Sequence, residues 1–374
     1  MNWASIGLRD RGAGRHTISQ EDINMFINKP KEELSQYVGH MSQVAGAMPF
    51  EFKGGRSEGV KAIEVKTGSG FRFTVIPDRG MDIANAEFGG KPIAWMCKNG
   101  IVAPQYFENG GFEFHRTFMG GLLTTCGLTQ VGAPGEDGDE VLGVHGRISH
   151  LPAESVNIHE AWQGEEYVIK IEGTLKETSL YAENLVLRRT ITTKMGETRF
   201  WIHDSIRNEG YNETPFMVLY HVNFGFPVVS ENSKLYCSSR KVRAWIDQKG
   251  NKASGEFDKF DPPTRNYLYN LFLHDLQVDQ KPARFGIINE PLSFGAYVSF
   301  DPSQLPLVTE WKMMGQQDYV VAIEPGNCIP EGRLEARKNQ RLQSLKPGES
   351  KEIEFEIGVL ESTEKIDRFV RNCK

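Results

Sequence analysis

Three short segments place an ionisable side chain where an apolar, strand-like run gives way to glycine or proline. These segments are 144–150, 219–225 and 320–327, and they carry His145, His221 and Glu324. Strand ends that open into loops are where protein scaffolds often hold their working residues. Two histidines and a glutamate can perform acid–base chemistry near neutral pH, and burial would raise the pKa of the glutamate towards that of a poised base. We therefore predict a shared acid–base site.

Other interpretations of the polar residues stay open at this level. A lone histidine near apolar side chains is usually a hydrogen-bonded core residue. We expect this structural role for four of the other histidines, namely His115, His159, His203 and His274. A metal site of the cupin type would use His145, His150 and Glu324, although the tight H-x-H spacing of such sites is missing. Cys126 could act as a nucleophile, but a buried free cysteine more often serves as a small hydrophobic residue.

The composition argues against several classes of protein. The 374 residues include 43 basic and 49 acidic side chains, a net charge of −6, whereas nucleic-acid binding requires a basic surface. The five cysteines are scattered without a C-x-x-C pair, so we expect neither a disulfide framework nor a thiolate zinc site. We see no apolar secretory segment at the N-terminus, and the longest apolar stretch, 216–229, is too short to span a bilayer. We expect a cytoplasmic protein with no membrane partner.

The elements that must position the predicted site have the pattern of β-strands. Apolar residues alternate with polar ones around 71–75, 169–172, 185–188, 200–204 and 352–359. Alternation with a period of two gives a strand one buried face and one wetter face. Glycine-containing turn signals separate the runs, and helix-length segments between them are missing, which disfavours a parallel βαβ sheet. The sequence predicts a large antiparallel all-β body.

We expect short helices at both ends of the chain. The N-terminal region 1–46 is interpreted as a partly helical arm, with one helix at 22–28 and a second at 31–38, after Pro30. The segment 361–374 is expected to close the chain as a helix, because Ile366, Phe369 and Val370 share one face. Without a linker between the strand runs, the expectation is one domain over 1–374.

Five motifs in the family's order resemble the aldose 1-epimerase superfamily, and more closely a bacterial branch of aldose-epimerase-like proteins with unassigned substrate. The motifs are Pro77-Asp78-Arg79-Gly80-Met81-Asp82, the glycine pair 120–121 with the following Leu-Leu-Thr-Thr-Cys-Gly, His145-Gly146-Arg147, Tyr220-His221-Val222-Asn223-Phe224-Gly225, and Ile323-Glu324-Pro325-Gly326-Asn327. The resemblance covers about residues 50–360. It implies a galactose mutarotase-like β-supersandwich with the site in a cleft of a concave sheet face.

The resemblance also implies roles for individual residues. Glu324 matches the general base that takes the proton from the C1 hydroxyl of a cyclic aldose, and His221 matches the general acid that protonates the ring oxygen. His145 matches a second histidine that binds the sugar, and Arg116 resembles an arginine that contacts its hydroxyls. Further substrate-binding residues on this reading are Arg79, Asn223, Trp311 and Lys312. The reaction implied is cofactor-independent and metal-free interconversion of the two anomers.

The substrate is left open by these motifs. Arg79, Trp311 and Lys312 belong to the bacterial branch and depart from classical galactose mutarotases. Arg79 and Lys312, together with Arg116 and Arg147, could favour an anionic sugar such as a uronate. The alternative is that some of these cations form structural salt bridges. We expect a small-molecule sugar as the partner and a monomer or homodimer as the assembly.

A second function remains possible for the same cleft. A carbohydrate-binding protein without catalysis would share the sugar contacts but would have no need of Glu324 as a base. Turnover in the unmodified protein distinguishes the two hypotheses.

Overall fold

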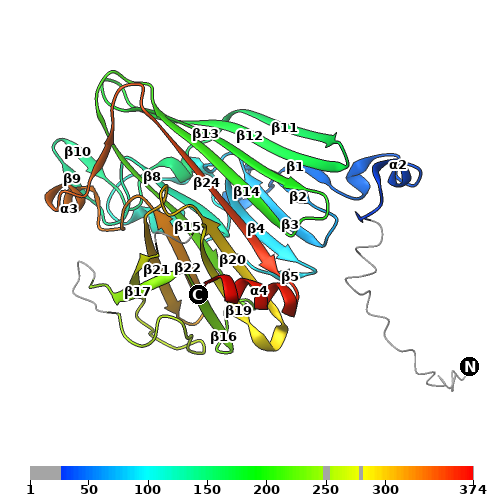
Figure 1. The fold of residues 1–374 in the computed structure, drawn as a ribbon. Helices are drawn as coiled ribbons and strands as arrows, with labels where there is room; N and C mark the ends of the chain where they lie inside the picture. Colours follow the sequence, from blue (N-terminus) through cyan, green and yellow to red (C-terminus); the bar gives the residue numbers. More distant parts are fainter. Residues whose placement is uncertain (1–26, 247–252, 278–280, 374) are drawn as a thin grey trace, which may run out of the picture.

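The computed structural model describes residues 27–246, 253–277 and 281–373, and two large antiparallel β-sheets dominate it (Figure 1). The larger sheet has twelve strands, with β5 added beside β4 and β23 beside β15. In spatial order they are β1 (Gly46–Glu51), β2 (Lys61–Lys66), β3 (Phe71–Ile76), β4 (Asp82–Phe88), β8 (Leu123–Leu128), β15 (Thr214–Phe224), β22 (Tyr319–Gly326), β21 (Leu307–Met314), β18 (Asn270–Leu276) and β17 (Ser239–Ala244), with β5 at Lys91–Pro92 and β23 at Gln343–Leu345.

The second sheet has eight strands and covers one face of the first. In spatial order they are β11 (Glu154–Gln163), β12 (Glu166–Thr178), β13 (Asn184–Lys194), β14 (Arg199–Asn208), β24 (Ser350–Leu360), β20 (Phe294–Phe300), β19 (Ala283–Asn289) and β16 (Ser233–Cys237). Two short pairs complete the strands, β6 (Trp95–Met96) with β7 (Gly120–Gly121) and β9 (Gly135–Asp137) with β10 (Glu140–Leu142). The predicted antiparallel all-β architecture is confirmed.

The main core lies between the two large sheets and follows from the alternation of side chains. In β15, Val218, Tyr220 and Val222 face this core, whereas the residues between them point to the opposite face. Aromatic rings connect the sheets directly: the ring centroids of Phe73 and Phe200 lie 4.6 Å apart, and a similar contact joins Tyr220 to Phe355 at 4.5 Å. Full burial of each such side chain stabilises the fold by about 1.5–3 kcal/mol.

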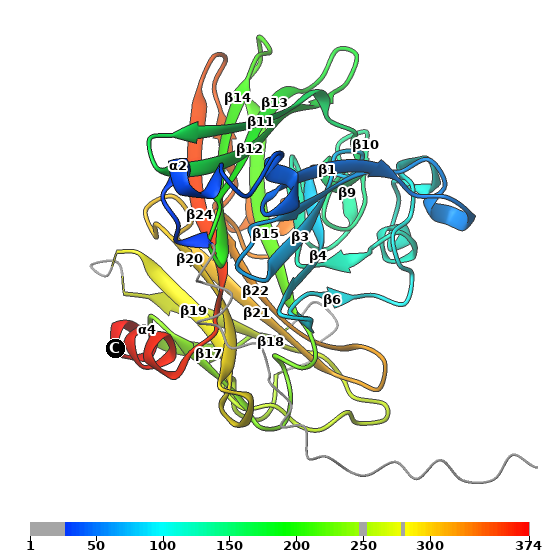
Figure 2. The ribbon, with the colours of Figure 1, turned by 90° about the vertical axis from the view of Figure 1, so that its right-hand side faces the viewer.

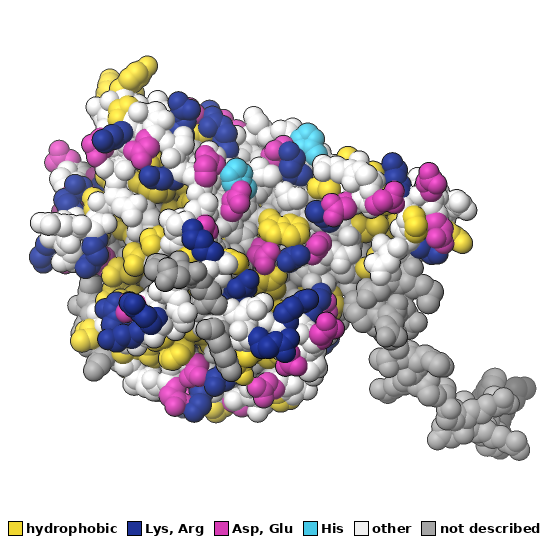
Figure 3. All heavy atoms as spheres, viewed as in Figure 1, with side chains coloured by type: hydrophobic (Ala, Val, Ile, Leu, Met, Phe, Trp, Pro, Cys, Tyr) yellow, Lys and Arg dark blue, Asp and Glu magenta, His cyan; other side chains and the backbone are white. Residues whose placement is uncertain are grey.

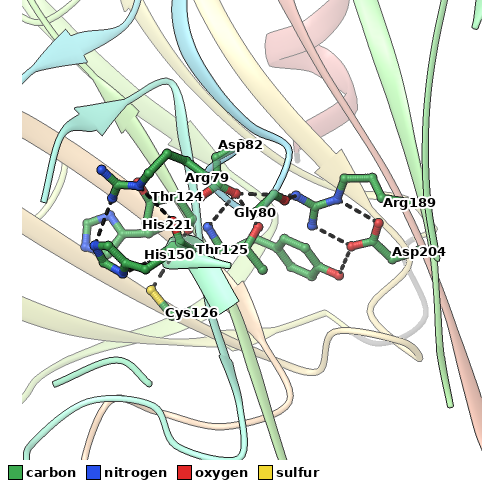
Figure 4. Close-up of polar contacts among 12 residues, drawn as sticks. Arg79, Gly80, Asp82, Thr124, Thr125, Cys126, His150, Arg189, Asp204 and His221 are labelled. Carbon is green, nitrogen blue, oxygen red and sulfur yellow. Dashed lines mark hydrogen bonds and ion pairs between the residues drawn. The ribbon is translucent and has the colours of Figure 1, made fainter. Parts of the chain in front are cut away.

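A network of buried charges also bridges the sheets (Figure 4). Arg189 of β13 forms two hydrogen bonds with Asp204 of β14, at 2.9 and 2.7 Å, and Tyr220 donates to the same carboxylate. The guanidinium also approaches Asp82 of β4 at 3.4 Å, and Asp82 in turn accepts hydrogen bonds from Thr125. Because a buried charge without a partner is costly, this network specifies how the two sheets are aligned.

The ends of the chain fit the expectation in part. The predicted helix at 22–28 falls almost wholly outside the described residues. The expected second helix is shorter, α2 at Lys31–Leu34, and lies beside the hairpin of β11 and β12 (Figure 2), where the backbone amide of Lys31 donates to Glu165. The closing helix is confirmed as α4 at Thr363–Cys373, where Phe369 and Cys373 are buried. Within the described ranges, every helix is too short or too polar to cross a membrane.

The surface carries charges of both signs in close proximity. On the face seen in Figure 3, lysine and arginine side chains alternate with aspartate and glutamate over the described residues. His203 of β14 pairs with Glu352 of β24 in this way, at 2.9 Å, with both side chains about half exposed. Such exposed pairs contribute little to stability, about 0–1 kcal/mol.

Candidate active site

His221 and Glu324 lie opposite each other on neighbouring strands. The register of β15 and β22 pairs Val222 with Ile323 and Leu219 with Gly326, which places His221 directly across from Glu324. Nε2 of His221 lies 3.1 Å from Oε1 of Glu324, and the two residues are only 5% and 2% exposed. The structure thus brings together the two side chains for which the sequence predicts acid–base roles.

The location of this pair follows from the alternation in β15. His221 falls between core-facing Tyr220 and Val222, so it must point to the outer face of the larger sheet. That face is covered by the short helix η4 (Glu113–Arg116), by Phe118 and by the loop that carries His145, instead of being open to water. The sheet therefore holds the ionisable pair rigidly while the covering loops dehydrate it.

A cavity of about 410 Å³ opens beside the pair. His145, His221 and Glu324 contribute to its lining, and so does His115, whose structural role in the core was expected but is not observed. The rest of the wall is mainly aromatic and apolar, and its largest members are Phe112, Phe114, Phe118, Tyr269, Trp245 and Trp311. A mostly apolar cavity with a few converging polar groups is the usual form of a small-molecule site.

His145 reaches the cavity by way of a tight turn. Its φ is 59°, and the following Gly146 has a φ of 73°. A Cβ at Gly146 would lie 2.5 Å from the carbonyl oxygen of Gly127, so only glycine fits against that backbone. The turn brings the His145 ring within 5.9 Å of the His221 ring, measured between centroids, in an edge-to-face contact.

Burial controls the protonation of these groups. Desolvation raises the pKa of Glu324 well above its usual range and lowers that of His221 to about 4, although Asn223 opposes the second shift. Desolvation also lowers the pKa of His145 to about 3, with a further contribution from the proximity of His221. Because the low-dielectric surroundings disfavour every charged form, the His221–Glu324 pair holds one proton near neutral pH.

Unpaired polar atoms gather around the same pair. Nδ1 of His145, Nδ1 of His221, Oδ1 of Asn223 and Oγ1 of Thr309 are buried and have no hydrogen-bond partner among the described residues. Thr309 of β21 is the cross-strand partner of Glu324, on the side away from His221. Most buried polar groups in proteins are paired, so this cluster indicates a place where a ligand or water completes the hydrogen bonding. The sequence alone did not reveal Thr309, because its proximity to Glu324 depends on the strand register.

Trp311 and Lys312 occupy opposite faces of β21. Trp311 lines the cavity, with its ring edge-on to that of His221 at 5.5 Å. Lys312 is 2% exposed, and its Nζ donates to the backbone carbonyls of Glu256 and Lys259. Lys312, predicted to contact the sugar, therefore faces away from the cavity that Trp311 lines, since neighbouring residues of a strand point to opposite faces.

Arg79 also lies outside the cavity lining and is fully buried (Figure 4). Its guanidinium donates to the carbonyl oxygens of Ser149, Val102 and Thr117, and it lies 2.9 Å from Nε2 of His150. These bonds tie together the loops that cover the site. The prediction that Arg79 contacts the sugar directly is thus replaced by a positioning role.

His150 is occupied by the same contacts. Its Nε2 lies 2.9 Å from both Arg79 and the hydroxyl of Thr117, and its ring stacks on Phe107. A cation at this distance is incompatible with a metal ligand at the same nitrogen, so the cupin-type set of His145, His150 and Glu324 is not assembled. Across residues 27–246, 253–277 and 281–373, no three His, Cys, Asp or Glu side chains are grouped as a metal site requires.

Arg116, Arg147 and Asn223, the other candidates for sugar binding, do not line the cavity either. Arg116 is exposed, pairs with Glu113 at 2.8 Å and faces a neighbouring depression, which shares Phe112 and His115 with the cavity. Arg147 pairs with Glu140 at 3.2 Å. Asn223 is fully buried behind His221, and its amide donates to the carbonyl oxygen of His221. Within the described part of the chain, the cavity lining contains no arginine or lysine.

The other residues for which a structural role was predicted differ in how deeply they are buried. His274 is a buried core histidine as expected, with Ser239 at 2.9 Å and Glu310 at 3.1 Å. His159 and His203, in contrast, are exposed and pair with acidic residues on the surface. Cys126 is completely buried, and burial raises its pKa well above the usual range, so it is a protonated hydrophobic residue as predicted.

The fold resembles that of solved structures of mutarotase-like proteins. A proposed aldose 1-epimerase from Klebsiella pneumoniae superposes with a TM-score of 0.81 at 21% identity, over 88% of this chain and 91% of that one. A galactose mutarotase-like protein from Clostridium acetobutylicum gives 0.58 at 17% identity, over 85% and 99%. Galactose 1-epimerase from Lactobacillus acidophilus gives 0.55 at 14% identity, also over 85% and 99%. The chain has a galactose mutarotase-like fold.

The family is defined by sequence. Residues 57–359 match the model described as a domain of unknown function, DUF4432, and the chain belongs to that family. The comparison with curated proteins found no match.

Proposed function

We propose that this protein is a cofactor-independent aldose 1-epimerase, which interconverts the anomers of a sugar. The observation that carries the proposal is the buried His221–Glu324 pair, 3.1 Å apart, at the wall of a ligand-sized cavity. Its mutarotase-like fold and its similarity to proteins described as aldose 1-epimerases support the same reaction class.

The single proton of the pair is enough for the reaction. In the tautomer with Glu324 ionised and His221 protonated, Glu324 accepts the proton of the C1 hydroxyl while His221 donates a proton to the ring oxygen. The bond between C1 and the ring oxygen breaks, and C1 becomes the carbonyl carbon of the open-chain aldehyde. Rotation about the C1–C2 bond exposes the other carbonyl face. Ring closure with the proton transfers reversed gives the other anomer and restores the pair.

The surroundings of the pair favour these proton transfers. Both protonation tautomers have no net charge, so the reaction never leaves an unpaired charge in the low-dielectric cavity. Positioned acid–base groups typically contribute about 10²–10⁴-fold to the rate. His145 is placed to hydrogen-bond a sugar hydroxyl, because its ring faces the cavity beside His221.

Anomer exchange measured by NMR tests the proposal directly. The protein should accelerate exchange for at least one member of a panel of neutral, acidic and phosphorylated sugars. Glu324→Gln and His221→Asn should each lower the rate by about 10²–10⁴-fold. The matched controls are Glu352→Gln and His203→Asn, which remove the same side chains from the exposed His203–Glu352 pair and should leave the rate unchanged.

The same experiment separates catalysis from binding. Rates unaffected by Glu324→Gln and His221→Asn would rule out the assigned roles. Calorimetric binding of a sugar that survives Glu324→Gln, with no turnover in the unmodified protein, would instead establish a carbohydrate-binding protein.

We also propose a cytoplasmic location and a monomeric or homodimeric state. All five cysteines are free, as a reducing compartment allows. The main core includes side chains from Ala45 to Val359 and from both large sheets, which supports one folding unit.

A further inference from the structure

A second cavity adjoins the candidate active site. Its volume is about 600 Å³, and it shares Ala133 and Trp245 with the first cavity. The chain passes from one to the other at residues 330–331, because Pro330 lines the first cavity and Glu331 lines the second. Ligand sites commonly have volumes of about 300–1,000 Å³, so each cavity is large enough to hold part of a ligand.

The chemistry of the two cavities differs. The first is mainly aromatic, whereas the second is lined by Glu331, Arg333, Glu335, Arg341 and Asn339. Arg333 and Glu331 are only 4% and 7% exposed, so they belong to a formed site and not to a mobile surface. The second cavity therefore offers many hydrogen-bond donors and acceptors, whereas the aromatic wall of the first cavity offers few.

The charges of the second cavity are internally neutralised. Arg333 pairs with Asp137 and with Glu140, and Arg341 pairs with Glu331. An anionic group would meet these carboxylates along with the arginines. A neutral, hydroxyl-bearing group would instead find both donors and acceptors without an unpaired charge.

We infer that the two cavities together bind a short neutral oligosaccharide with a free reducing end, an inference that rests on the proposed function. The reducing unit occupies the aromatic cavity, with C1 at Glu324 and His221. The next sugar unit passes Trp245 and occupies the second cavity. Only the hemiacetal reacts, so the glycosidic bond between the units stays intact.

The structure offers a way to block the second cavity alone. Gly135 of β9 lines it, and a Cβ added there would have no heavy atom within 4 Å. Its φ is not in the left-handed region, so a side chain causes no backbone strain. Gly135→Trp should fill the second cavity, and Leu334→Trp provides an independent variant from the same lining. Gly39→Trp is the matched control, since Gly39 has equally open surroundings and lines neither cavity.

Anomer exchange and calorimetric binding of maltose, cellobiose and glucose test the inference. The unmodified protein should have a kcat/KM at least about tenfold higher for a disaccharide than for glucose, equivalent to about 1.4 kcal/mol. Gly135→Trp and Leu334→Trp should remove this preference without changing kcat/KM for glucose, and Gly39→Trp should change neither value. Thermal melts of all three variants establish that each is folded.

The outcomes distinguish the inference from the proposed function. Equal kcat/KM for the disaccharides and glucose, or an equal loss for both in Gly135→Trp, would overturn the second-unit site while leaving the epimerase intact. A higher kcat/KM for glucuronate or glucose 6-phosphate than for the neutral sugars would overturn the neutral ligand class. If the unmodified protein binds a disaccharide without turning over any sugar, and Gly135→Trp loses that binding, the second-unit site stands and the proposed catalysis fails. Absence of both turnover and binding would overturn the inference.

Discussion

Nε2 of His221 lies 3.1 Å from Oε1 of Glu324, with both side chains dehydrated between a β-sheet and its covering loops. At this distance the two groups titrate together, so their apparent pKa values belong to the pair. Burial shifts the pKa of the histidine down and that of the glutamate up. The form with one proton is therefore favoured over a wide range of pH.

This coupling predicts an unusual pH profile for catalysis. The rate should stay nearly constant as the pH falls through 6.5, the usual pKa of histidine, and should decline only near pH 4, where the His221–Glu324 pair gains a second proton. NMR exchange rates at saturating sugar between pH 3.5 and 9 measure the profile. An acidic decline centred near pH 6.5 would show that His221 titrates as an exposed histidine and would contradict the assigned burial.

His145 predicts a pH dependence of stability. Its pKa is about 3 in the folded protein and about 6.5 when unfolded, so the unfolded chain binds more protons between these values. The free energy of unfolding should therefore fall as the pH is lowered from 6.5 towards 4, by up to about 1.4 kcal/mol per pH unit from this residue. Urea unfolding of the unmodified protein and of His145→Asn measures the effect. Asparagine tolerates the positive φ, and the variant should have the shallower dependence.

Identical pH slopes for the two proteins would exclude a buried neutral His145. His203→Asn serves as the control, because His203 is exposed beside Glu352 and lies outside the cavity.

Thr309 predicts a separation of stability from activity. Its hydroxyl is buried beside Glu324 with no partner in the described residues, and an unpaired buried polar group costs about 1–3 kcal/mol. Thr309→Val keeps the branched shape that suits a strand, so the variant should be at least as stable as the unmodified protein. If the bound sugar or a water molecule at Glu324 hydrogen-bonds to the Thr309 hydroxyl, kcat/KM of Thr309→Val should nevertheless fall. Thermal melts and anomer exchange together measure both quantities, and unchanged kcat/KM would exclude a role at the site.

The sequence predicted the centre of the site better than its surroundings. His221 and Glu324 fall in apolar strands and His145 in a turn just before Gly146, and the ordered motifs indicated their shared cavity. Alternation also separates Trp311 from Lys312, but the motif placed both near the sugar. Thr309 could not be found because residues on β21 and β22 become neighbours only through the strand register.

The basic residues show the clearest limit of sequence reasoning. A charged side chain is usually exposed, so the complete burial of Arg79 against three carbonyl oxygens depends on loops far apart in the chain. The same reasoning cannot distinguish Arg79 from Arg116, which is exposed and paired with Glu113. Their different environments give the two arginines different expected behaviour.

Substitution of these arginines tests whether they bind an anionic sugar or maintain the fold. Arg79→Met should lower the free energy of unfolding by at least about 3 kcal/mol, because three buried carbonyl oxygens and His150 lose a charged donor. Arg116→Ala should change it by no more than about 0.5 kcal/mol, as is usual for an exposed position. Urea unfolding gives both values, and calorimetry with glucuronate and glucose measures binding.

A loss of glucuronate binding in Arg116→Ala, with glucose binding unchanged, would restore the anionic-sugar hypothesis. The structure predicts equal binding in Arg116→Ala and the unmodified protein, because Arg116 is exposed, already pairs with Glu113 and does not line the cavity.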